Sequence, residues 1–83
     1  MTYSVSFDVL DCSGKFVRSN PKTGLSRKEV KVITAGYQIV LAMQIDAEPK
    51  AIFERSDKEE YVSFMTEIGG KETYIGGINV VKM

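Results

Sequence analysis

The stretch LSRKEV at residues 25–30 decides the fold, because it carries two separate signals for the start of a helix. Ser26 and Glu29 have the spacing of a capping box, in which each side chain accepts a hydrogen bond from a backbone N–H left unpaired by the first turn. The apolar residues at the two ends of the stretch stand at the positions of a hydrophobic staple. No proline interrupts the chain that follows. We therefore predict one long helix over residues 27–46.

Apolar residues recur at helical spacing through this segment and form two ridges. The first ridge is expected to pack on a sheet and consists of Val30, Ile33, Tyr37, Val40, Leu41 and Gln44. A helix that packs on one sheet needs only one apolar face, so the second ridge is an additional one. It consists of Val32, Ile39 and Met43. We expect this interface ridge to be buried either by a curled sheet or by a second copy of the chain.

The same segment also has some features of strands. Residues 37–45 alternate between apolar and polar positions, several residues are β-branched, and Ala35-Gly36 is compatible with a turn. If the helix prediction fails, the chain becomes a small all-β barrel of the OB or SH3 type. The capping box and staple favour the helix over this alternative.

The remaining elements follow from alternating apolar residues and from glycine- or proline-containing turns. Gly76-Gly77 falls inside the last strand and predicts a bulge or the close approach of another backbone. The order is ββαβββ, a single α+β domain over residues 1–83 with one helix on an antiparallel sheet of four or five strands. We expect strands at 3–9, 15–19, 51–55, 61–68 and 73–83, and a loop at 20–24.

Composition restricts the kind of protein this is. At 83 residues the chain has the size of one small domain. It contains one cysteine, Cys12, and neither a signal-peptide pattern nor an apolar run long enough to cross a membrane, so we expect a cytoplasmic protein. Histidine, the commonest general base and metal ligand, is absent. We therefore expect no catalytic residues, no metal and no cofactor, and classify the protein as a non-enzyme.

The net charge is zero, but the charges are segregated. Residues 15–31 carry six bases and one acid, for a local charge of +5, and residues 46–72 carry eight acids and four bases, for −4. The basic segment contains an aromatic residue, a combination found in proteins that bind single-stranded nucleic acid. It is a candidate surface for an acidic protein or for nucleic acid and consists of Lys15, Phe16, Arg18, Lys22, Arg27, Lys28 and Lys31.

Asp57, Glu59 and Glu60 form a candidate acidic patch, although their spacing matches no calcium-binding loop. Together these features predict a small protein-binding domain that acts as an inhibitor or accessory factor, of the phage or mobile-element type, on a larger macromolecule. The alternative is a nucleic-acid-binding protein that uses the basic segment. The sequence identifies neither the partner nor the oligomeric state.

Overall fold

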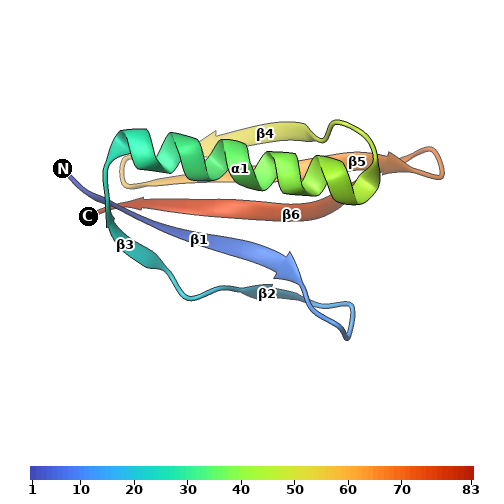
Figure 1. The fold of residues 1–83 in the computed structure, drawn as a ribbon, viewed down its shortest axis with the longest axis horizontal. Helices are drawn as coiled ribbons and strands as arrows, with labels where there is room; N and C mark the ends of the chain where they lie inside the picture. Colours follow the sequence, from blue (N-terminus) through green and yellow to red (C-terminus); the bar gives the residue numbers. More distant parts are fainter.

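Helix α1 spans Arg27–Ile45 and lies along one face of an antiparallel sheet in the computed structural model, which describes residues 1–83 (Figure 1). Both halves of the capping box are present: Glu29 N donates to Ser26 Oγ at 3.1 Å, and Ser26 N donates to Glu29 Oε1 at 3.0 Å. The helix ends where Asp46 adopts a left-handed conformation with φ 54°. The helix prediction is confirmed, and the two-strand alternative with its β-barrel is wrong.

The sheet has the order β2-β1-β6-β5-β4, and β3 also pairs with β1. All strand pairs are antiparallel, so the predicted α+β fold is confirmed. Both β2 and β3 pair with β1 and together fill the place of the second strand in the predicted order. The strands are β1 (Tyr3–Leu10), β2 (Phe16–Arg18), β3 (Lys22–Leu25), β4 (Lys50–Arg55), β5 (Glu59–Ile68) and β6 (Lys71–Lys82).

β3 corrects the prediction that residues 20–24 form a loop. Pro21 and Gly24 are turn signals, but they flank or interrupt an edge strand rather than preventing it. Tyr3 pairs with Leu25, which brings the staple leucine into the core next to the helix start. The register of β1 and β3 shifts once between Tyr3 and Val5, as expected for an irregular edge strand.

The core lies between the helix and the sheet, but the helix is rotated relative to the predicted ridge. Val30 and Leu41 are buried, Tyr37 is half-buried, and Val40 and Gln44 are exposed, contrary to our expectation. The line from Val30 to Leu41 therefore faces the sheet, and the half-buried helix positions are Ile33, Thr34, Tyr37, Gln38, Ala42 and Ile45. The buried hydrophobic core consists of Val5, Leu25, Val30, Leu41, Val62, Phe64, Ile78 and Val80.

The glycine pair in β6 coincides with an irregularity in the sheet, as predicted. Phe64 of β5 pairs with Gly76, but the next residue, Met65, pairs with Tyr74, so Ile75 is a bulge. Close approach is also present at Gly76, because an added Cβ would lie 3.3 Å from the Asp8 carbonyl oxygen and would collide with the Tyr37 hydroxyl. No helix of the structure is both long enough and apolar enough to cross a membrane.

Candidate functional site

The sheet divides at the Ile75 bulge. β1 pairs with β6 from Tyr3 as far as Asp8, whose partner is Gly77. Beyond this point Val9 and Leu10 pair only with β2, while the first residues of β6 pair only with β5. The two hairpins bend apart next to the C-terminal half of α1 (Figure 1). We call this division the fork.

Tyr37 stands at the point of the fork. Its hydroxyl donates a hydrogen bond to the Asp8 carbonyl oxygen at 3.0 Å, the last carbonyl of β1 before the strands separate. Its ring packs against Phe7 and Phe64, with centroid distances of 4.9 and 5.7 Å. The helix thus supplies an aromatic ring that fills the fork and a hydrogen-bond donor to the backbone at the last position of β1 that pairs with β6.

A cleft of about 480 Å³ lies in the fork. Its rim includes large apolar side chains that the fold leaves in solvent: Leu10 and Ile68 are each 58% exposed, and Phe16 is 41% exposed. This fork cleft combines residues from both faces of the sheet and from the helix, so it opens through the division between the hairpins. It is lined by Val9, Leu10, Phe16, Tyr37, Leu41, Gln44, Ile45, Ile68, Thr73, Tyr74 and Ile75.

A hydrogen-bonded cluster on the helix-free face supports one wall of the cleft. The Arg18 guanidinium binds both carboxylate oxygens of Asp8, at 3.0 and 3.2 Å. Tyr61 donates to the same carboxylate, and because its single proton is then used, it accepts from Tyr74. Tyr74 in turn packs edge-on against Phe16 at 4.7 Å between ring centroids. The cluster therefore links the two hairpins directly below the fork.

The cluster shifts the pKa values of its members. Hydrogen bonds and charge from Arg18 hold the pKa of the Asp8 carboxyl below its ordinary value. Burial raises the pKa of Tyr61 far above that of a free phenol, and the hydrogen bond to Asp8 adds to this effect. Burial also raises the pKa of Tyr74. At neutral pH the cluster holds one ion pair and two neutral phenols, an arrangement suited to fixing structure.

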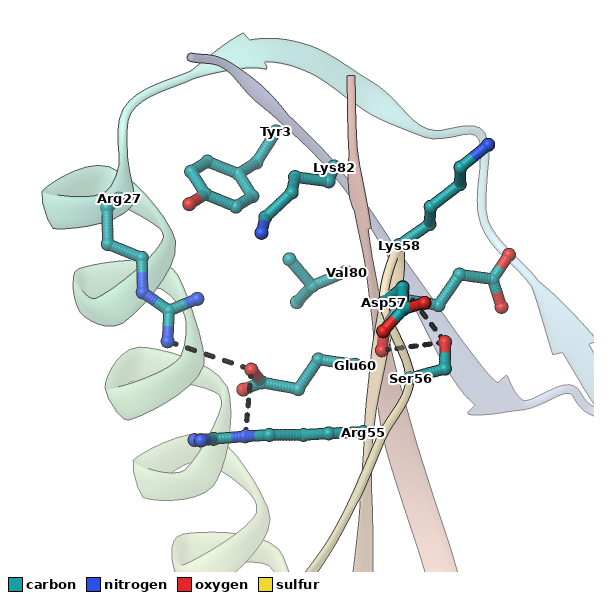
Figure 2. Close-up of a pocket in the computed structure, with 10 residues that line it drawn as sticks. Tyr3, Arg27, Arg55, Ser56, Asp57, Lys58, Glu60, Val80 and Lys82 are labelled. Carbon is teal, nitrogen blue, oxygen red and sulfur yellow. Dashed lines mark hydrogen bonds and ion pairs between the residues drawn. The ribbon is translucent and has the colours of Figure 1, made fainter.

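At the opposite end of the sheet lies a polar pocket of about 350 Å³ (Figure 2). Glu60 forms ion pairs with two arginines, with Arg55 on β4 at 3.2 Å and with Arg27 on the helix at 3.6 Å. The Arg27 guanidinium also lies over the Tyr3 ring, 5.6 Å from its centroid. These contacts connect the first turn of the helix to β4 and β5. Both arginines next to Glu60 are therefore already paired with its carboxylate.

The structure separates the residues of the predicted basic segment. Phe16 and Arg18 lie on the helix-free face of the sheet, whereas Lys22 pairs with Val5 and therefore faces the helix side. Arg27, Lys28 and Lys31 belong to the helix. The two arginines are held in ion pairs with Asp8 and Glu60. The segment is therefore not a single continuous surface, and nucleic-acid binding through it stays a prediction.

The predicted acidic patch is also divided. Asp57 lies in the exposed turn between β4 and β5. Glu59 and Glu60 are consecutive strand residues, so their side chains point to opposite faces of the sheet. Glu60 faces the helix and pairs with Arg27 and Arg55. In the structure no group of three or more Asp, Glu or Cys side chains is placed to hold a metal ion.

The predicted interface ridge lies on the outer side of α1. The sheet does not cover it: Val32 is 68% exposed, Ile39 60% and Met43 77%. Val40, which we placed in the core, is also exposed beside the ridge. Of the two coverings that we considered for this face, the curled sheet is wrong.

Among the residues that line the fork cleft, only Phe16 was assigned a binding role from the sequence. Val9-Leu10 and Ile68 read as ordinary strand ends, and their proximity depends on two hairpins that are distant in sequence. The Gly76-Gly77 pair was the one available signal, because it marked where β6 departs from regular pairing. In comparisons with known proteins, no family model, curated protein or solved structure matches the chain.

Proposed function

We propose that this chain is a small non-catalytic protein-binding domain that takes an extended apolar segment of a larger partner protein into the fork cleft. The proposal rests on one observation: apolar side chains and strand edges without partners occur together in the cleft. Such an arrangement suits an inhibitor or accessory factor, which acts by occupying a surface of its target. The proposal includes a cytoplasmic location.

The chemistry of the cleft favours a polypeptide segment over other occupants. Thr73 and Tyr74 pair only with β5, and Leu10 pairs only with β2, so backbone groups face the fork from both hairpins. An added strand satisfies such groups through its own N–H and C=O groups, and its alternate side chains enter apolar pockets. The exposed Leu10, Phe16 and Ile68 supply apolar contacts of this kind.

Peptides displayed from a random library provide the test. The immobilised chain is expected to enrich extended sequences with alternating apolar residues. A bound peptide should slow hydrogen exchange at the amides of residues 9–10 and 73–75. Leu10→Glu and Ile68→Glu should each abolish enrichment, because they place a charge on the rim of the cleft. Both side chains are largely exposed, so the variants should remain folded.

Phe53→Glu is the matched control, because Phe53 is an exposed apolar residue on β4, at the other edge of the sheet. This variant should enrich the same peptides as the parent. The proposal is wrong if no peptide is enriched above the Leu10→Glu background, or if protection appears outside the fork. Enrichment of oligonucleotides by the parent, lost in an Arg18→Glu/Lys22→Glu/Lys28→Glu variant, would support the basic segment instead.

A further inference from the structure

The outer face of α1 presents a narrow apolar seam with a regular spacing. Val32, Gly36, Ile39 and Met43 follow one another at intervals of four, three and four residues. This is the spacing of the positions that meet between two helices in a coiled coil. The three side chains are among the most exposed large apolar groups of the protein. Helix α1 has the sheet on one side only (Figure 1).

Gly36 leaves a gap in the middle of this seam. A Cβ added there would have no atom within 4 Å, so neither the sheet nor any other part of the chain requires a glycine at this position. A glycine inside an exposed helix nevertheless costs about 1 kcal/mol relative to alanine. At a helix–helix contact the missing side chain provides a hole for a large side chain of the facing helix.

The seam is complementary to itself when two copies run in opposite directions. A two-fold axis near the middle of α1 places Gly36 against Ile39 of the second copy, and Val32 against its Met43. The large Ile39 then fills the hole at Gly36 twice, once in each direction. In a parallel pair, by contrast, glycine faces glycine and leaves a void.

The charges at the two ends of the seam favour the same orientation. Lys28 lies on this face in the first turn of the helix, while Asp46 and Glu48 follow its last turn, which contains no basic residue. An antiparallel pair brings each lysine close to the acidic end of the other copy. A parallel pair brings lysine to lysine and acid to acid. Opposed helix dipoles add to the preference.

We infer that the outer face of α1 binds a second copy of this chain, forming an antiparallel helix pair in which Ile39 of each copy enters the gap at Gly36 of the other. This interface is separate from the fork cleft of the proposed function. The dimer and peptide binding can therefore succeed or fail independently, because they depend on different residues.

Disulfide cross-linking tests the orientation in a Cys12→Ser background, which removes the single native cysteine. Val32→Cys and Met43→Cys proteins, one of them carrying an affinity tag, are mixed and oxidised. We expect covalent pairs that contain one chain of each kind, and little cross-linking of either protein alone. Glu54→Cys, an exposed site on β4, gives the background from random collisions. Cross-linking of each variant with itself, or a yield no higher than this background, overturns the inference.

Gly36→Ala tests the gap with a readout that a purely structural role would not produce. Alanine should raise the thermal midpoint of the dilute monomer, because it favours the helix. It should also weaken self-association, measured by analytical ultracentrifugation over a wide concentration range, by about tenfold. Ile39→Asp should abolish association while the monomer remains folded. A parent that stays monomeric throughout, or a Gly36→Ala variant that associates as tightly as the parent, contradicts the inference.

Discussion

The two halves of β1 show how much a single neighbouring strand determines. Val5 and Val9 lie on the same face of this strand, four residues apart, yet Val5 is 1% exposed and Val9 is 36% exposed. Val5 has β6 beside it and the first turns of the helix above it. Val9 lies beyond the fork, where β6 has moved away. The same residue type therefore serves as core in one half and as the wall of a cleft in the other.

If the proposed function holds, stability and binding depend on different halves of the sheet. In the paired half, between the polar pocket and the fork, the core side chains are buried, and hydrophobic burial is the dominant favourable contribution to folding. In the divided half, comparable apolar side chains retain much of their contact with water, so burying them remains available to a partner.

The largest expected effect comes from making the same substitution in both halves. Ile78 is fully buried in the paired half, whereas Ile68 is 58% exposed in the divided half. Ile78→Ala should lower the free energy of unfolding by about 2–5 kcal/mol, because it removes buried methyl groups and leaves a cavity. Ile68→Ala should change it by no more than about 0.5 kcal/mol. Urea denaturation measures both, and equal losses would show that the two halves do not differ in this way.

A smaller effect is expected at the boundary between the halves. A Cβ at Gly77 would lie 2.6 Å from the Tyr74 hydroxyl oxygen and would also meet the Tyr61 hydroxyl. Gly77→Ala should therefore destabilise the protein by about 1–3 kcal/mol through overpacking.

The control for this substitution removes the two oxygens. In a Tyr61→Phe/Tyr74→Phe background, Gly77→Ala should cost measurably less, and a double-mutant cycle isolates the difference. An identical loss in both backgrounds would mean that the tyrosine hydroxyls are not the cause, and that the backbone or the remaining Tyr61 ring carbon, 2.7 Å from such a Cβ, requires the glycine.

The elements predicted correctly are those specified by local chemistry. The capping box around Ser26 and Glu29 identified the start of the helix, and alternation identified β1 and β5. β3 was missed because its strand character comes from pairing with β1 and not from its own residues. The rotation of α1 was also mispredicted, since Val40 is as apolar as the buried positions and only the placement of the sheet decides between them.

The fork cleft could not be predicted from the sequence for a more general reason. It depends on the separation of two hairpins that are paired through different strands, and neither hairpin shows this separation on its own. The interface ridge, by contrast, could be located on the helix, because its residues recur at helical spacing, and the structure leaves all three exposed. Sites built from one element can be predicted from sequence, whereas sites built between elements require the topology.

The smallest expected effect concerns pH and the cluster that joins the hairpins. The pKa of Asp8 is depressed in the folded protein, chiefly by Arg18, so its ionised form stabilises the fold above about pH 4. This contribution is lost as the pH falls through the folded-state pKa. Because Arg18 is half exposed, we expect only about 0.5–1 kcal/mol. Asp8→Asn removes the charge and should reduce the loss of stability between about pH 5 and pH 2.

Asp57→Asn is the matched control for this experiment, because it removes the same charge from an exposed turn that has no ion pair in the structure. Thermal unfolding across the acidic range should give parent and Asp57→Asn curves of the same shape, with Asp8→Asn less steep. If all three curves run parallel, the ion pair adds no pH-dependent stability. The hairpins would then be held together below the fork by the tyrosine hydroxyls and the packing of Phe16 on Tyr74.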